Sequence, residues 1–308
     1  MRIVVTGAGG FVGRELVAAL KDSHDLVGID TVPLPEGCRP IQGDLTDQKT
    51  LDAAFAEPCD AVIHLATVPG AAAEANPALA KRVNLDATMA LIDAAAATGK
   101  RTRFVFASSI AVFGAPLPTI VDDTTLLTPR MIYGAHKAMM ETWIAAQSRR
   151  GAIDGLSIRL PGIVARPELA AGFKSAFMSD VFHALRAGHG FVSPVSPSAT
   201  MWLSSARQLI DNLCIALSVC QSLPDSRAIT LPALRVTMAE LVATIAEQTG
   251  ADPALVTYAP DAALESAFGA QPPLTTAQAE NLGFRHEGQL PTLVANTLAS
   301  LDTERTDP

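Results

Sequence analysis

The chain has 308 residues, of which 49% are hydrophobic and 18% are charged, and its formal net charge is −8. This length and apolar content suffice for one large domain or two smaller ones. The negative charge argues against binding to nucleic acid or to an anionic membrane, although a local pocket can still attract an anionic substrate. No apolar run reaches the roughly eighteen residues that a membrane-spanning helix needs.

The N-terminal segment MRIVVTG is already typical of a strand and a turn. It leaves no room for a signal peptide, so a cytoplasmic location is expected. The four cysteines include no Cys-x-x-Cys pair, and the six histidines include no His-x-x-x-His pair. We therefore expect thiols in a reducing compartment and no metal centre. His64, in AVIHLAT, is interpreted as a structural residue at a buried strand end.

Apolar runs rich in Val, Ile and Phe alternate with helical patterns over the first 165 residues. Strands are predicted at 2–7, 24–30, 39–45, 60–66, 102–109 and 155–162. Helices are predicted at 10–22, 49–56, 77–100 and 132–151. Continuous apolar strands separated by helices indicate a parallel sheet that is buried on both faces. The expected fold class is therefore α/β, a doubly wound parallel sheet.

After about residue 165 the pattern becomes less regular. Helical stretches at 173–188, 204–221, 237–249 and 289–301 are separated by short apolar runs and prolines. This pattern predicts a smaller, mainly helical lobe for the substrate. We expect a dinucleotide-binding domain at 1–165 and a substrate lobe at 166–308, interleaved at the sheet edge as one compact unit. The final residues, DTERTDP, are typical of a frayed tail.

The segment VVTGAGGFVG places Gly7, Gly10 and Gly13 between the first strand and the first helix. Glycines in this context let the backbone turn tightly and approach a pyrophosphate at the start of the helix. Asp30 ends the second predicted strand, and a carboxylate there accepts hydrogen bonds from ribose hydroxyls and repels a 2′-phosphate. Because Thr31 and not an arginine follows, the expected cofactor is NAD and not NADP.

Asp44 and Leu45, in the segment GDL after the third strand, have two interpretations. They can border the adenine of the cofactor, or Asp44 can simply cap the following turn. The residue types and spacing favour neither interpretation.

Tyr133, one of only two tyrosines, precedes Lys137 by four residues in IYGAHK. That spacing places both side chains on one helix face, where the lysine charge favours the phenolate form of a tyrosine. Ser108 and Ser109, at the end of the fifth strand, can reach a substrate hydroxyl. Beside a nicotinamide, such a Ser, Tyr and Lys set can move a proton while a hydride leaves carbon.

Six motifs occur in the order seen in extended short-chain dehydrogenases/reductases: TGAGGFVG, GDL, HLA, VNLDATMALIDAA, FVFASSIAVFG and YGAHK. The chain resembles this family over residues 1 to about 165. The resemblance implies that Ser109, Tyr133 and Lys137 are catalytic. It also implies a cofactor site, and we assign that site to the following residues: Gly7, Gly10, Phe11, Val12, Gly13, Asp30, Asp44, Leu45, Leu65, Ala66, Asn84, Tyr133, Lys137 and Pro161.

Within that family, several segments resemble the D-erythronate dehydrogenases, which oxidise a four-carbon sugar acid to its 2-keto acid with NAD. These segments are SSIAVFGAPLPTIVDDTTLLTPRMIYGAHK, RLPGIVARP and MWLSSARQLIDNL. The expected function is therefore NAD-dependent oxidation of a small sugar acid. One alternative is a nucleotide-sugar epimerase or dehydratase with tightly bound NAD. A second alternative is a dinucleotide-sensing protein without catalysis.

The substrate is expected to contact Ser109 and Tyr133, together with Arg166, Ser175 and Trp202 from the C-terminal lobe. An arginine grips a carboxylate through two parallel hydrogen bonds, so Arg166 is the candidate for the acid group. It can instead be a surface residue paired with Glu168. Apolar runs in the helices at about 78–98 and 135–150, with the family resemblance, predict a homodimer.

Overall fold

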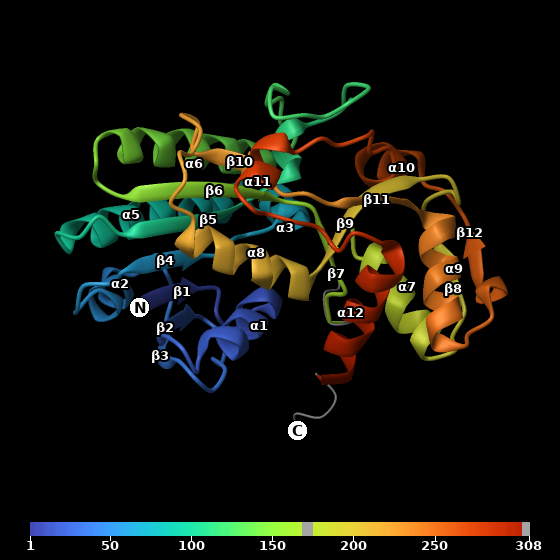
Figure 1. Cartoon of the computed structure of the whole chain (residues 1–308), viewed down its shortest axis with the longest axis horizontal. Coiled ribbons are helices and arrows are strands. Elements are labelled where there is room, and N and C mark those ends of the chain that lie inside the picture. Colours follow the sequence, from blue (N-terminus) through green and yellow to red (C-terminus); the bar gives the residue numbers. More distant parts are fainter. Residues whose placement is uncertain (168–174, 304–308) are drawn as a thin grey trace. The chain divides into compact units, whose positions relative to one another are not determined.

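The computed structural model describes residues 1–167 and 175–303, which form two compact units (Figure 1). The first unit comprises Met1–Gly114, Leu127–Leu160 and Leu213–Thr230. The second unit contains the rest of the described chain. The predicted tail at 304–308 and the first residues of the helix predicted at 173–188 lie outside the described residues.

The first unit is built on a seven-stranded sheet in which every neighbouring pair is parallel. The strands in order across the sheet are β10 (Ala228–Thr230), β6 (Asp154–Leu160), β5 (Arg103–Ser109), β4 (Ala61–His64), β1 (Arg2–Thr6), β2 (Asp25–Asp30) and β3 (Arg39–Gln42). The strand order reverses between β1 and β4, which is where doubly wound sheets bind their ligands. The predicted fold class and its six strands are confirmed. β10 comes from the segment that the sequence analysis assigned to the C-terminal lobe.

Helices surround this sheet because its strands are apolar on both faces. The helical elements of the first unit are α1 (Phe11–Leu20), α2 (Gln48–Ala54), α3 (Gly70–Ala75), α4 (Pro77–Lys81), the π-helix η1 (Arg82–Ala87), α5 (Thr88–Ala97), the 3-10 helix η2 (Ile110–Phe113) and α6 (Ile132–Arg149). Val4 and Phe106 pack in one core cluster with Ile92 of α5 and Ile144 of α6. The alternate strand position Val5 is also fully buried, so both faces of the sheet are covered.

The second unit contains two small sheets and several helices. β9 (Thr200–Ser205) pairs antiparallel with β11 (Leu234–Thr237) and parallel with β7 (Gly162–Val164), while β8 (Phe191–Ser193) pairs with β12 (Val256–Tyr258). Its helices are α7 (Phe177–Arg186), α9 (Met238–Thr249), the 3-10 helix η3 (Pro253–Leu255), α10 (Ala262–Phe268), α11 (Ala277–Asn281) and α12 (Leu290–Thr303). The core joins side chains of α7, α9 and α12 to those of β9.

Helix α8 (Ala206–Ser218) contains the boundary between the units. The predicted helix at 204–221 covers it, but strand β9 occupies the segment directly before Ala206. β9 is buried at almost every position, so its sequence does not alternate and cannot be told from a buried helical segment by period alone. None of the helices in the described part of the chain combines the length and apolarity needed to cross a bilayer.

Candidate active site

The turn between β1 and α1 depends on glycine at two positions for its own packing. Gly7 has a φ of +73°, and a Cβ there would lie 2.8 Å from the amide nitrogen of Ala66. A Cβ on Gly13 would lie 2.1 Å from the carbonyl oxygen of Gly7. Gly10 differs, because its Cβ would meet only that same oxygen, at 3.3 Å. The surface beside Gly10 is therefore open to a ligand.

Helix α1 begins at Phe11, directly after this turn, and no side chain caps its N-terminus. The first N–H groups of a helix carry a partial positive charge and attract anions. An open glycine turn with uncapped amides behind it fits the pyrophosphate of a dinucleotide, as the sequence predicted. Gly10, Phe11 and Val12 are the residues that would hold it.

Asp30, at the end of β2, is held in place by the same turn. Its Oδ2 accepts a hydrogen bond from the Gly9 amide at 3.0 Å, and its Oδ1 accepts one from the Thr31 amide at 2.7 Å. Arg14 stabilises the turn and the segment after β2, since it donates hydrogen bonds to the carbonyls of Gly9 and Pro33 at 2.8 and 2.7 Å. The sequence analysis missed Arg14, because no motif marks it. The carboxylate oxygens keep further lone pairs for ribose hydroxyls.

Asp44 caps the turn that follows β3. Its Oδ1 accepts a hydrogen bond from the Thr46 amide at 2.8 Å, and its carbonyl accepts one from the Asp47 amide at 3.1 Å. The capping interpretation of Asp44 therefore has direct contacts in its support. Leu45 beside it is buried.

Asn84 ties the loop after β4 to the π-helix η1. Its Oδ1 accepts from the Val68 amide at 2.7 Å and from the Thr67 hydroxyl at 3.1 Å, and its Nδ2 donates to the Val68 carbonyl. This loop begins with Leu65 and Ala66, two of the predicted cofactor residues. Single π turns are frequent at functional sites. Asn84 thus holds the backbone of this loop, and its role in cofactor binding stays a prediction.

His64, the last residue of β4, is fully enclosed and bonded at both ring nitrogens. The Thr6 hydroxyl lies 2.6 Å from Nδ1, and the Thr88 hydroxyl lies 2.8 Å from Nε2. Burial, aided by the charge of Lys137, lowers the pKa of His64 to about 3. A neutral imidazole between two threonines agrees with the structural role expected from the sequence.

The two serines at the end of β5 have different surroundings, because successive strand residues face opposite sides of a sheet. Ser108 is 1% exposed and donates to Oε1 of Glu141 at 2.5 Å. Ser109 is half-buried, and its hydroxyl oxygen accepts from the amide of Ala111 at 3.1 Å. The hydroxyl of Ser109 can still donate its own proton. The geometry therefore favours Ser109 as the serine that meets a substrate.

Helix α6 brings Tyr133 to the segment that follows Ser109. Gly134 allows a very close approach, because a Cβ there would lie 2.4 Å from the carbonyl oxygen of Ala111 in η2. Tyr133 is half-buried in the first turn of the helix. Ser109 ends β5 directly before η2, and both of these elements pack on α6, the helix that carries Tyr133.

Lys137 lies one turn further along α6 and is only 3% exposed. Its Nζ donates to the Ala107 carbonyl at 2.7 Å and lies 5.5 Å from the centre of the Tyr133 ring. Burial lowers the pKa of Lys137 to about 7, while the charge of Glu141 raises it. The ammonium is therefore close enough to stabilise a phenolate and has a pKa matched to neutral pH.

Arg166 lies in the second unit, two residues beyond β7. Its amide donates to the Ser179 hydroxyl at 3.0 Å, and Nε2 of His183 lies 2.7 Å from its carbonyl oxygen. Both partners belong to α7, so the backbone that carries the guanidinium is anchored to a helix. Glu168, the alternative partner of Arg166, lies outside the described residues.

Ser175 and Trp202, the other two predicted substrate residues, also belong to the second unit. Ser175 is half-buried in the turn before α7. Trp202 is 2% exposed, and its indole N–H donates to the Pro272 carbonyl at 2.8 Å. The polar group of Trp202 is therefore already used, and only its ring could line a binding site.

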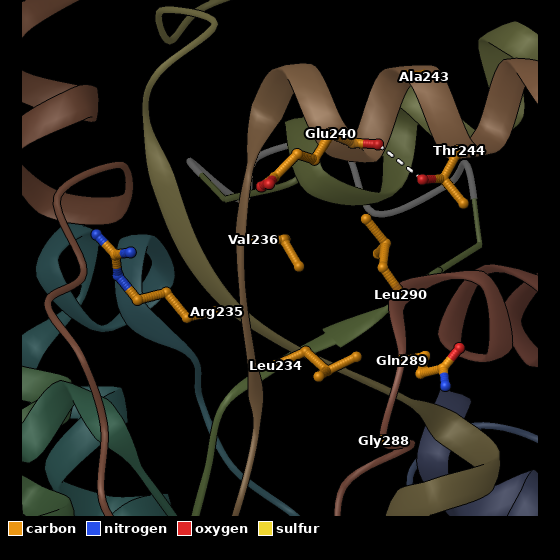
Figure 2. A pocket seen from close by; sticks show the side chains of 9 residues that line it. All are labelled: Leu234, Arg235, Val236, Glu240, Ala243, Thr244, Gly288, Gln289 and Leu290. Atoms are coloured by element: carbon orange, nitrogen blue, oxygen red, sulfur yellow. Dashed lines mark hydrogen bonds between the residues drawn. The ribbon is translucent and has the colours of Figure 1, made fainter.

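A pocket of about 410 Å³ lies in the second unit between β11, α9 and the segment before α12 (Figure 2). Its charged residues already serve the fold. Glu240 closes a capping box with Thr237 at the start of α9, and Arg235 donates to the Gln271 carbonyl at 2.8 Å. None of the predicted site residues lines this pocket, and we assign no ligand to it.

The cysteines and the possible metal ligands of the described residues were predicted to have no catalytic role. The four cysteines are free thiols, and burial raises the pKa of Cys38 and Cys59. No group of three or more His, Cys, Asp or Glu side chains within residues 1–167 and 175–303 is arranged to hold a metal ion.

Comparison with known proteins decides the family. The model of the NAD dependent epimerase/dehydratase family matches residues 3–211, which include the glycine turn, Ser109, Tyr133 and Lys137. The chain belongs to this family. It is thus an enzyme of the extended short-chain dehydrogenase/reductase type, and NAD is its cofactor. The residues around Gly10 and Asp30 fit that cofactor, as described above.

Two curated relatives and one solved structure are similar over most of the chain. D-erythronate dehydrogenase from Cupriavidus necator is 34% identical and covers 93% of this chain and 94% of its own length. D-erythronate dehydrogenase from Haemophilus influenzae is 33% identical and covers 81% of this chain and 83% of its own length. A structure described as the nucleoside-diphosphate-sugar epimerase from Agrobacterium tumefaciens is 30% identical, with a TM-score of 0.87. It covers 96% of this chain and 92% of its own length.

Proposed function

We propose that this enzyme oxidises a small sugar acid, similar to D-erythronate, to its 2-keto acid with NAD. The observation that carries the proposal is the 34% identity with a D-erythronate dehydrogenase over 93% of the chain. That similarity extends well beyond the cofactor domain and so includes the part of the chain that differs most among enzymes of this fold. A cytoplasmic location remains the expectation from the sequence.

The arrangement of Ser109, Tyr133 and Lys137 supports this chemistry. When bound, NAD accepts a hydride from the substrate carbon. Tyr133 takes the proton of the hydroxyl on that carbon, and the nearby Lys137 ammonium stabilises the phenolate that this role requires. The Ser109 hydroxyl donates to the reacting oxygen and holds it in place.

Arg166 is our candidate for the substrate carboxylate. A guanidinium offers two parallel N–H groups, which match the two oxygens of a carboxylate and fix its orientation. The anchoring of the Arg166 backbone by Ser179 and His183 supports a binding role, because a fixed backbone limits the conformational entropy lost when a ligand binds. Ser175 and the ring of Trp202 are weaker candidates for the same substrate.

A nucleotide-sugar epimerase is the second candidate, favoured by the structural similarity to the Agrobacterium protein. Two observations weigh against it. The segment TMWLSSARQLIDNL lacks the Arg-Asp and Val-Asp-Asp-like pattern that many sugar-nucleotide enzymes carry there. The two curated relatives described above are also named as dehydrogenases of a sugar acid.

One assay separates the two candidates. The purified enzyme is mixed with NAD and a panel of four- to six-carbon aldonic and uronic acids, and reduced cofactor is followed by absorbance. We expect steady formation of reduced NAD with D-erythronate or a close stereoisomer. A parallel incubation contains UDP-glucose in place of the acids. Net conversion of UDP-glucose to an epimer there, without any reduced NAD from the acids, would overturn the proposal in favour of the epimerase.

A further inference from the structure

A buried ionic cluster adjoins the catalytic residues within the first unit. Arg159 on β6 donates to both carboxylate oxygens of Glu141 on α6, with distances of 2.8 to 3.2 Å. Ser108 on β5 donates to the same carboxylate. The side chains of Glu141 and Arg159 are only 4% and 10% exposed. The carboxylate is therefore well bonded and almost free of contact with water.

Of the two candidate catalytic residues on α6, Lys137 is closer in sequence to Glu141 than Tyr133 is. Glu141 follows Lys137 by four residues, so the two side chains lie on the same face of the helix. They also bind neighbouring residues of β5, Lys137 at the Ala107 carbonyl and Glu141 at the Ser108 hydroxyl. Because both groups are buried, their charges interact with little screening by solvent.

The other titratable groups on the elements packed around Lys137 cannot replace this carboxylate. His64 on β4 is neutral, and Tyr133 on α6 is the group to be ionised. Arg159 on β6 is a cation, and His136 on α6 also has a lowered pKa, caused chiefly by burial. On α3, α4 and η1 the titratable side chains are exposed, namely Glu74, Lys81, Arg82 and Asp86. Asp154, at the other end of β6, is only half-buried and pairs with Arg103 and Arg227. Among the described residues of these elements, Glu141 is therefore the one buried carboxylate near Lys137.

We propose that Glu141 is a positioning residue for the reaction, whose buried carboxylate keeps Lys137 a cation beside Tyr133. Arg159 and Ser108 hold the carboxylate in place for that role. Burial alone favours the neutral amine, in which Lys137 could no longer stabilise a phenolate. The Glu141 carboxylate opposes this effect of burial, because its negative charge raises the pKa of Lys137.

A purely structural role is the competing explanation of the cluster. Replacing a buried ion pair by well-packed apolar residues is often neutral or stabilising, so the pair is weak evidence for a contribution to stability. Arg159 also lies over the Phe113 ring, with 5.3 Å between the guanidinium carbon and the ring centre, and so helps to pack η2. The two explanations differ in what they predict for the titration of Lys137.

The test is a pH titration of Lys137 in the cofactor-free protein, followed through the ¹³Cε signal of labelled lysine. Only six lysines are present, so the signal can be assigned with a Lys137→Arg variant. The wild-type midpoint is expected near pH 7. In Glu141→Gln we expect it to fall by roughly one pH unit, because the opposite charge is gone. The rising limb of the kcat profile should move to higher pH, since less ammonium is available to Tyr133.

Further variants keep the test decisive. Ser108→Ala removes one hydrogen bond but keeps the carboxylate charge, so the Lys137 midpoint should stay close to the wild-type value. If Glu141→Gln does not fold because Arg159 is left unpaired, the double variant Glu141→Gln/Arg159→Gln is compared with Arg159→Gln, which lacks the same guanidinium but keeps the carboxylate, and the midpoint of the double variant should be the lower of the two. An unchanged midpoint in whichever Glu141 variant folds, measured against its own reference protein and with a lower free energy of unfolding, would show that the cluster is structural only.

This inference rests on the catalytic roles that the proposed function gives to Tyr133 and Lys137. The two can nevertheless fail separately, because the lysine titration needs neither substrate nor NAD. A shifted midpoint without activity on any sugar acid would leave the inference standing and overturn the proposed substrate. An unchanged midpoint in an enzyme that oxidises D-erythronate would do the reverse.

Discussion

Tyr133 is half-buried at the start of α6, with the Lys137 ammonium 5.5 Å from the centre of its ring. At the scale of single residues, the proposed role of Tyr133 as a base depends on this nearby ammonium. A tyrosine in water has a pKa near 10 and is a poor base at neutral pH. A cation held in a dry environment makes the phenolate accessible, and Ser109 supplies a hydroxyl from the adjoining element.

Tyr133→Phe tests the base. We expect kcat to fall by about 10²–10⁴-fold, as is typical when a general base is removed, while the Kd for NAD measured by calorimetry stays the same. The other tyrosine offers a matched control, since Tyr258→Phe should retain full activity. A Tyr133→Phe enzyme with most of its kcat would remove Tyr133 from the catalytic role.

Arg166→Lys tests the carboxylate site. Lysine keeps the charge but cannot form two parallel hydrogen bonds, so KM for the acid should rise about tenfold or more while the Kd for NAD is unchanged. Arg235→Lys, an exposed arginine elsewhere in the second unit, is the matched control and should leave KM unaltered. An unaltered KM in Arg166→Lys would move the carboxylate site elsewhere, with backbone donors near Ser109 as the next candidates.

At the scale of elements, the candidate cofactor site lies where β1, β2 and β4 end. The turn after β1 packs against Ala66 beyond β4, and the Gly9 amide in that turn binds Asp30 at the end of β2. The π-helix η1 holds the β4 loop through Asn84. Each contact joins two elements, so a change in one of them alters the shape of the whole site.

The end of β2 determines our prediction for cofactor choice. The Asp30 carboxylate should repel the 2′-phosphate of NADP, so kcat/KM with NAD should exceed that with NADP by at least tenfold. Asp30→Asn should reduce this ratio by removing the charge. Asp44→Asn, which alters a carboxylate that caps a turn, should not change it. An equal or higher kcat/KM with NADP in the wild type would contradict the prediction.

His64 links β1 and β4 to α5, and it makes the stability of the first unit sensitive to acid. An unfolded histidine binds a proton near pH 6.5, whereas His64 in the folded protein does so only near pH 3. Between these values the unfolded state binds more protons, so the free energy of unfolding should fall as the pH falls. The slope from this one group is at most about 1.4 kcal/mol per pH unit.

Urea unfolding of the wild type and of His64→Gln between pH 4 and 7 measures this effect. Glutamine does not titrate, so the difference in unfolding free energy between the two proteins isolates His64. We expect the advantage of the wild type to shrink steadily below pH 6.5. A difference that is independent of pH would show that His64 has the same pKa in the folded and the unfolded state.

At the scale of the whole molecule, α6 presents apolar side chains that its own unit does not cover. Met139 and Trp143, one turn apart on this helix, are 56% and 38% exposed. Large apolar side chains that remain exposed on a helix are typical of an interface with another chain. Together with the family resemblance, they support the homodimer predicted from the alanine-rich helices.

Light scattering at micromolar concentration tests the assembly. The wild type should have the mass of two chains, and Trp143→Lys should shift it towards one chain, because a charge would be buried at the interface. Leu126→Lys changes a side chain that is 80% exposed in the second unit, and it should leave the mass unaltered. A wild-type protein with the mass of a single chain would rule out the dimer.

Local sequence patterns were sufficient to predict the fold class and most of the candidate site residues of this protein. The apolar runs, the helical periods and the glycine turn predict the parallel sheet and the NAD site, because each pattern depends on residues that are close along the chain. The four-residue spacing of Tyr133 and Lys137 places both on one helix face for the same reason. The resemblance to a family then singled out Ser109 from its neighbour.

Only the tertiary structure decided what surrounds these groups. Ser108 meets Glu141 33 residues away, and Arg159 meets it from 18 residues away, with no local pattern to announce either contact. β10 joins the sheet from a segment more than sixty residues beyond β6. Burial of Lys137 and His64 depends on side chains from several elements at once. Desolvation is a property of the folded core, and it sets their pKa values.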